Sequence, residues 1–182
     1  ALIVPGKNYT KYSDFKGLPN VGVAESHDQH DIDRLAQWLA GEIDIRRTTF
    51  AAAGAENFSE YLQQQPSLPS DSTPLPHYFL IIDNIDPLLA YSDFHQVSQT
   101  IATTGYELGM RMIVGASLSA WKTMQQNGYR DCFTARIALG LNANESTDLF
   151  DFDIHDDLGP IGDAHIHTTQ HGLMRCRLAK SL

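Results

Sequence analysis

The feature that most constrains this chain is a run of five large apolar residues, Tyr78 to Ile82, that ends at an acid, Asp83. A continuous apolar run of this length is typical of a strand covered on both faces, as in a parallel sheet between helix layers. An acid at the carboxyl end of such a strand points into the crevice where open α/β sheets bind ligands. The residues alone leave two interpretations open: a ligand-directing acid, or an Asp that only begins the next turn.

The rest of the sequence alternates short apolar strands with amphipathic helices. Apolar residues recur at helical spacing from Ile32 to Phe50, which predicts a long helix over about 31–53 with Arg46 on a polar face. Further strands are expected at 1–4, 21–24, 110–116 and 135–141, helices near 55–65, 93–105, 120–127 and 144–150, and a hairpin that pairs 163–168 with 172–178. This order predicts an α/β sheet with an antiparallel end.

Composition narrows the class of protein. The length of 182 residues suits a single domain. A formal net charge of −9 argues against nucleic-acid binding, because phosphate contacts need clustered Lys and Arg. Two cysteines, Cys132 and Cys176, are too few for a disulfide framework and suit a reducing compartment. No apolar stretch approaches the roughly 20 residues of a membrane helix.

Four stretches, in this order, resemble segments of the FtsK/SpoIIIE family of P-loop motor ATPases, and most of all the EccC/EssC ATPases of type VII (ESX) secretion systems. Residues 18–24 are similar to the family's LPHVGGVA segment, and residues 42–47 to its E(M/L)xxRR helix. Residues 79–84 resemble its Walker B strand, and residues 105–117 its GxxxGIHVVVTA(S/T) strand.

The resemblance implies a RecA-like fold, mostly parallel, with ATP and Mg²⁺ as ligands. If nucleotide binds, Asp83 would direct Mg²⁺ through water, and Asn84 and Ser117 would face the γ-phosphate. No metal site beyond this one is expected, and no residue is assigned as catalytic, since Asn84 stands at the position where active members often carry an acid.

The sequence differs from the family pattern at residues that take part in phosphate binding and hydrolysis. The sequence has no G-x-x-x-x-G-K-[ST], so it lacks the backbone cradle and the lysine that hold the β- and γ-phosphates. An amide at Asn84 cannot take a proton from an attacking water as a carboxylate can. In the family the P-loop lies before the equivalent of Ala1. We therefore expect residues 1–182 to form one FtsK/SpoIIIE-like domain, cut from a multi-domain chain, without its Walker A segment.

Other groups of polar residues have weaker interpretations. Histidines and acids crowd the C-terminal stretch, and His165 with His167 would share one strand face, but polar residues on an edge hairpin are favoured over a zinc site. A disulfide between Cys132 and Cys176 is disfavoured. Arg136 is interpreted as a partner in a sheet-edge ion pair, with an arginine finger as the alternative.

The function expected from the resemblance is that of a type VII secretion ATPase domain with weak or no hydrolysis, acting in assembly, regulation or substrate recognition. An active ATP-driven translocase domain with its P-loop upstream is the alternative, and a DNA translocase relative is the second alternative. Expected partners are other ATPase domains of the same chain and small helical secreted proteins, without nucleic acid. The expected location is the cytoplasmic face of the cell membrane, with membrane contact only through the rest of the parent protein.

Overall fold

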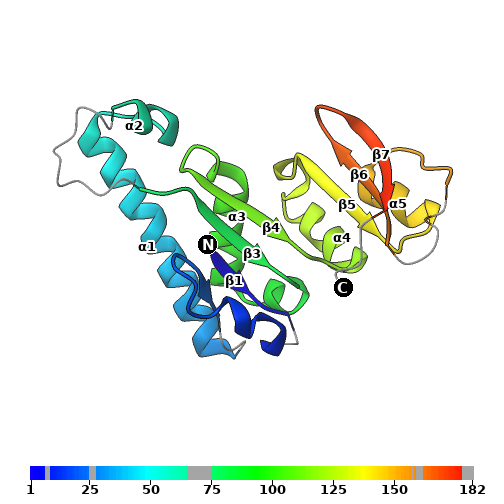
Figure 1. Cartoon of the computed structure of the whole chain (residues 1–182), viewed down its shortest axis with the longest axis horizontal. Coiled ribbons are helices and arrows are strands. Elements are labelled where there is room, and N and C mark those ends of the chain that lie inside the picture. The colour runs from blue at the N-terminus through cyan, green and yellow to red at the C-terminus, as the bar shows by residue number, and fades with distance from the viewer. Residues whose placement is uncertain (7–8, 25–27, 65–74, 157, 159–161, 178–182) are drawn as a thin grey trace. The chain divides into compact units, whose positions relative to one another are not determined.

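The computed structural model describes residues 1–6, 9–24, 28–64, 75–156, 158 and 162–177. Contacts divide the chain into two compact units, Ala1–Ala120 and Trp121–Leu182, and Figure 1 shows the elements of each. The prediction that the whole chain is one domain stays a prediction. Within the described ranges, no helix has the length and apolar content needed to cross a membrane.

The first unit is built on a parallel sheet of four strands in the order β2-β1-β3-β4. These strands are β1 (Leu2–Val4), β2 (Gly22–Val23), β3 (Tyr78–Ile82) and β4 (Met110–Val114). The apolar run that ends at Asp83 is therefore an interior strand, hydrogen-bonded to β1 on one side and to β4 on the other. Its position agrees with the prediction from the sequence.

The two faces of this sheet are not equally covered in the described part of the chain. Val4, Leu80 and Ile82 share one face and are at most 1% exposed. On the opposite face Phe79 is 41% exposed and Ile113 is 56% exposed. In the described part of the chain, the predicted cover is therefore complete on one face of β3 and only partial on the other, where Ile3 is buried but Phe79 and Ile113 are exposed.

Helices α1 (Gln29–Ala53) and α3 (Ser92–Thr104) pack against each other, and α2 (Phe58–Gln64) packs on α1. The Asp28 side chain caps α1 by accepting from the backbone N–H of Asp31. Gly54, at φ 71°, ends this helix in the left-handed conformation that glycine adopts without a steric cost. The predicted long helix is confirmed, starting two residues earlier than expected.

Arg46 corrects one prediction about α1, because its side chain is buried rather than on a polar face. The guanidinium donates to the Glu42 carboxylate at 2.7 Å and to the backbone oxygens of Leu108 and Pro76 at 2.9 and 2.8 Å. It also lies near the rings of Phe58 and Tyr78. One side chain thereby ties α1 to the segments that lead into β3 and β4.

The second unit is an antiparallel sheet in the order β5-β6-β7, made of β5 (Ala135–Leu139), β6 (Asp163–Thr168) and β7 (Gly172–Arg177). Helix α4 (Leu118–Gln126) leads into it, and α5 (Ala143–Phe150) packs on β5. Its small core holds Ala138, Phe150 and Ile154. The predicted α/β fold, with a parallel sheet and a C-terminal antiparallel hairpin, is confirmed.

Candidate functional site

The carboxyl ends of three parallel strands meet at one edge of the first sheet. Val4, Ile82 and Val114 are in register across β1, β3 and β4. The residues that follow these strands therefore lie next to one another, and they include Gly6, Asp83 and Ser117. This edge is where open α/β sheets bind their ligands.

Asp83 is exposed, but its carboxylate already has one donor from the segment that follows β1. The backbone N–H of Gly6 donates to Oδ2 at 3.0 Å. Tyr12 lies in the same segment, on the 3₁₀ helix η1 (Tyr9–Phe15). Partial burial, and then the nearby Asp83, raise the pKa of the Tyr12 hydroxyl.

Two glycines allow the backbone to come this close to Asp83. A Cβ added at Gly6 would lie 2.5 Å from Asp83 Oδ2. A Cβ added at Gly115, just after β4, would collide with the backbone oxygen of Asp83. Gly115 needs glycine because the clash there is with backbone, whereas a side chain at Gly6 would displace the Asp83 carboxylate from its hydrogen bond.

Asn84 and Ser117, the other two predicted site residues, are held by hydrogen bonds within the chain. Asn84 Oδ1 accepts from the backbone N–H of Asp86 at 3.0 Å. Ser117 Oγ accepts from the backbone N–H of Ala120 at 3.1 Å and lies 2.9 Å from Ser119 Oγ. The structure thus places all three predicted residues at the same edge, with their side chains engaged.

Asp86 is a member of this edge that the sequence did not reveal. Its Oδ1 accepts from the backbone N–H of Ser117 at 3.0 Å, which links the end of β3 to the end of β4. Asp86 also begins the 3₁₀ helix η3 (Asp86–Ala90), with Pro87 in its first turn. The dipeptide Asp86-Pro87 marks a turn in the sequence, but the bond to Ser117 has no local signal.

The residues present fit Mg²⁺ only in part. Mg²⁺ takes oxygen ligands and usually keeps several waters, so the exposed Asp83 carboxylate suits a contact through water. The Asn84 and Ser117 oxygens already accept from backbone N–H groups. Across the described ranges, no three His, Cys, Asp or Glu side chains converge to hold a metal ion directly.

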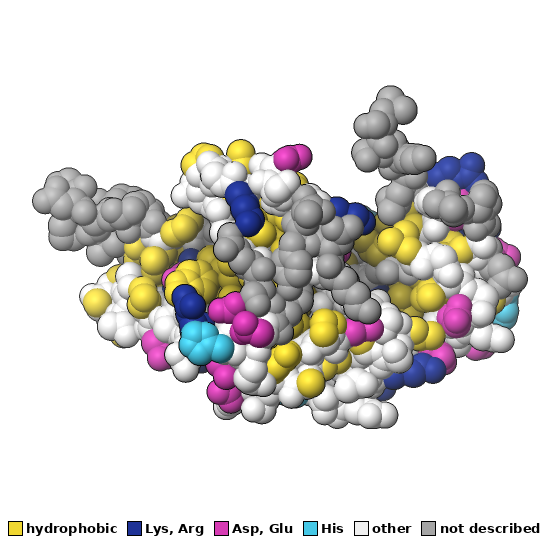
Figure 2. Space-filling model, turned by 90° about the horizontal axis from the view of Figure 1, so that it is seen from below, with side chains coloured by type: hydrophobic (Ala, Val, Ile, Leu, Met, Phe, Trp, Pro, Cys, Tyr) yellow, Lys and Arg dark blue, Asp and Glu magenta, His cyan; other side chains and the backbone are white. Residues whose placement is uncertain are grey.

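A groove lies at the opposite, amino-terminal ends of the strands in the first unit. It has a volume of about 1370 Å³ and is lined by Trp38, Tyr78, Glu42 and Val23, among others. The rings of Trp38 and Tyr78 lie 5.7 Å apart. Figure 2 shows hydrophobic side chains among acidic and basic ones on the face seen from below. Burial, and then the charge of Glu42, raise the pKa of the Tyr78 hydroxyl.

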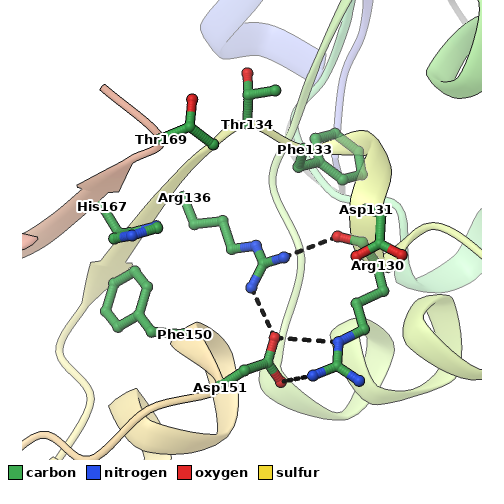
Figure 3. A pocket seen from close by; sticks show the side chains of 9 residues that line it. All are labelled: Arg130, Asp131, Phe133, Thr134, Arg136, Phe150, Asp151, His167 and Thr169. Atoms are coloured by element: carbon green, nitrogen blue, oxygen red, sulfur yellow. Dashed lines mark hydrogen bonds and ion pairs between the residues drawn. The ribbon is translucent and has the colours of Figure 1, made fainter. Parts of the chain in front are cut away.

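A cavity of about 300 Å³ in the second unit surrounds Arg136 (Figure 3). The Arg136 guanidinium pairs with Asp151 at 2.9 Å, donates to the backbone oxygens of Leu149 and Arg130, and lies over the Trp121 ring. Arg130 pairs with the same Asp151 carboxylate at 3.2 Å. The interpretation of Arg136 as a partner in a sheet-edge ion pair is confirmed.

The chain matches known proteins in its structure but not in its sequence. The sequence matches no protein-family model and has no significant match among curated proteins. The structure is similar to the cytoplasmic domain of the Thermomonospora curvata type VII secretion ATPase EccC, with TM-score 0.75 and 18% identity over 98% of this chain and 21% of that one. A second EccC structure, ATPases 2 and 3 in complex with a signal sequence peptide, has TM-score 0.62 and 15% identity over 97% of this chain and 31% of that one.

The pCW3 conjugation coupling protein TcpA, in its monomer form with ATPγS, is also similar, with TM-score 0.69 and 14% identity over 97% of this chain and 51% of that one. The chain spans between a fifth and about half of the length of these proteins. At these identities the likeness shows the fold alone. The chain therefore has the RecA-like fold of the ATPase domains found in EccC-type secretion ATPases and in the coupling protein TcpA.

Proposed function

We propose that this chain is an FtsK/SpoIIIE-like domain of a type VII protein secretion ATPase, with weak or no ATP hydrolysis of its own. It acts in assembly, regulation or substrate recognition. The observation that carries this proposal is the state of the candidate site: Asp83, Asn84 and Ser117 all use their side chains in hydrogen bonds within the chain.

The chemistry of Asn84 supports weak hydrolysis. A general base needs a free lone pair of suitable basicity within reach of the attacking water. An amide oxygen has too little basicity, and Asn84 Oδ1 already accepts from the N–H of Asp86. When bound, Mg²⁺ would neutralise developing phosphate charge, and here Asp83 is the residue placed to orient it through water.

One observation favours the alternative, an active translocase domain whose P-loop lies upstream in the parent chain. In the described part of the chain β4 pairs only with β3, so the far edge of β4 carries unpaired backbone groups. Ile113, on β4, and Phe79, on the neighbouring strand β3, are exposed on one face of the sheet. A free apolar edge of this kind is suited to pairing with another strand, and a strand that carries the P-loop would fit there.

The proposed partners and location come from the resemblance. Other ATPase domains of the same parent chain and small helical secreted proteins are the proposed partners. One similar EccC structure holds a signal sequence peptide, and the length of the similar proteins leaves room for further domains. The proposed location is the cytoplasmic face of the cell membrane. A DNA-pumping role is disfavoured, because the net charge of −9 repels phosphate.

Calorimetric titration with Mg·ATP tests the proposal. The chain is titrated within its parent protein, and the same protein with Asp83→Ala is titrated for comparison. We expect no heat of binding that depends on Asp83 at millimolar nucleotide. Micromolar binding that Asp83→Ala abolishes would instead favour a live nucleotide site, as in the active translocase. Salt-dependent binding of duplex DNA would be needed to support the DNA translocase.

A further inference from the structure

The strand β7 (Gly172–Arg177) is the last strand of the second sheet (Figure 1). In the described part of the chain it pairs only with β6. In an antiparallel ladder the backbone groups of alternate residues face opposite sides, so every second residue of β7 turns its N–H and C=O away from β6. This row of unpaired backbone groups is what an added strand recognises.

The free edge of β7 is open to solvent along its length. Five of its six residues are exposed, and the sixth, Cys176, is partly buried. No other described strand is longer, and only β6 is as long. By contrast β2, at an edge of the first sheet, has two residues. The length of β7 therefore allows an added strand to form several backbone hydrogen bonds.

The side chains of β7 carry positive charge on an acidic chain. The strand holds Arg175 and Arg177 and no acid, whereas the whole chain has a net charge of −9. Both guanidiniums bond to the buried Asp163 carboxylate, yet their side chains are 48% and 66% exposed. A guanidinium has five N–H donors, so each arginine keeps donors for a second carboxylate. Because one acid faces two arginines, this edge keeps a net positive charge.

The pattern of side chains along β7 defines the strand that would fit beside it. Successive side chains point to opposite faces, so Leu173, Arg175 and Arg177 lie on one face and Met174 and Cys176 on the other. Favourable cross-strand pairs join opposite charges or two apolar residues. The complement of β7 is therefore a strand whose acids lie opposite the arginines and whose apolar residues lie opposite Met174 and Cys176.

We propose that β7 is a docking edge for an extended acidic segment of another protein, which adds to the second sheet as its fourth strand. A second copy of this chain is a poorer partner, because pairing two β7 strands would place arginines beside arginines. The proposal concerns the second unit, and it does not depend on whether the first unit binds nucleotide.

Binding of a synthetic peptide to the full chain tests the proposal. The probe is a fluorescent peptide in which Glu alternates with Val. One control peptide has Lys in place of Glu, and another has the same Glu and Val residues grouped in two blocks. Fluorescence anisotropy measures the affinity of each peptide, and hydrogen exchange followed by NMR shows which amides of β7 become protected.

The alternating Glu peptide should bind and the two control peptides should not. Its affinity should fall as salt screens the arginines. Alternate amides within Gly172–Arg177 should gain protection when this peptide is bound, because strand addition pairs their N–H groups. Binding without new protection in β7, or an equal affinity for either control peptide, would overturn the proposal, as would no binding at all.

Met174→Glu adds a negative charge to the edge and removes an apolar contact, so it should weaken binding of the Glu peptide by about fivefold or more. Ile45→Glu is the matched control, since Met174 is 41% exposed on β7 and Ile45 is 55% exposed on α1, in the other unit. Equal losses in the two variants would contradict docking at β7. If Met174→Glu does not fold, the comparison of the three peptides on the wild-type chain decides.

Two further measurements distinguish other occupants of this edge. Protection of β7 amides that rises with protein concentration, without peptide, would show that a second copy takes the edge. Binding to vesicles of anionic lipid by a chain that does not bind the Glu peptide would assign the arginines to a membrane surface. Either result would overturn the proposal.

Discussion

At the scale of single residues, Arg46 shows how a charged side chain can belong to a core. It lies three residues after Ile43, seven after Leu39 and four before Phe50, which places it on the apolar stripe of α1. The spacing therefore contained the signal, but charge suggested a polar face. Burial is tolerated because three hydrogen bonds, to Glu42, Leu108 and Pro76, satisfy the guanidinium.

Replacement of Arg46 by Ala should destabilise the chain by about 3–5 kcal/mol, because it leaves buried acceptors without a donor. Urea unfolding followed by circular dichroism measures the change. Arg47→Ala is the matched control, since Arg47 is the exposed neighbour on the same helix and should change stability by less than about 0.5 kcal/mol. Equal effects of the two substitutions would contradict the role given to Arg46.

The donors that contact Asp83 and Asp86 could not be predicted from the sequence. The sequence placed an acid at the end of a buried strand, and the parallel register explains why Gly6 and Ser117 lie beside it. Which donors satisfy that acid depends on residues far away in the sequence, such as Gly6 for Asp83 and Ser117 for Asp86. Local propensity contains no information about such pairings.

At the scale of elements, two arginines of β7 pair with one buried acid of β6. Asp163 accepts from Arg177 Nε at 2.7 Å and from Arg175 at 3.1 Å, both on β7. The alternation of apolar and basic residues predicted this hairpin from the sequence. Gly172, at its turn, has a φ of 66°, in the left-handed region that favours glycine. The buried acid was not predicted to pair with these arginines, because strand register is set by the fold.

The pKa of Asp163 predicts how the hairpin responds to acid. Hydrogen bonds from Arg177 and then Arg175 hold the pKa of this carboxyl below its usual range. A carboxyl whose pKa is lower in the folded state stabilises the protein above its unfolded pKa and loses that contribution as the pH falls through its folded pKa. The stabilisation should therefore be complete at neutral pH and fade below about pH 4.

Thermal unfolding of the wild-type chain and Asp163→Asn between pH 2 and pH 7 checks this. The wild type should be more stable at pH 7, and the difference in Tm should shrink as the pH falls below about 4. Asp148→Asn is a control, since Asp148 pairs with Lys122 on the surface and surface pairs contribute little. A difference between wild type and Asp163→Asn that stays constant with pH would contradict the assigned ion pairs.

At the scale of the whole molecule, the order of strands and helices was the most predictable property. Apolar runs and glycine turns mark β3, β4 and the hairpin directly, and the interior position of β3 follows from its unbroken apolar character. The incomplete cover over Phe79 was not predictable, because it depends on which elements are present to pack there. A sequence pattern records that a side chain is apolar, not which partner covers it.

The central proposal is that this chain, which has a RecA-like fold, keeps the Asp83 carboxylate engaged within the chain and contributes little hydrolysis. The most direct test is phosphate release from ATP by the parent protein, compared with its Asp83→Ala variant under saturating Mg·ATP. We predict equal rates within about twofold, because a direct role of a catalytic group in the reaction contributes far larger factors. A fall of about a hundredfold or more in the Asp83→Ala protein would contradict the account.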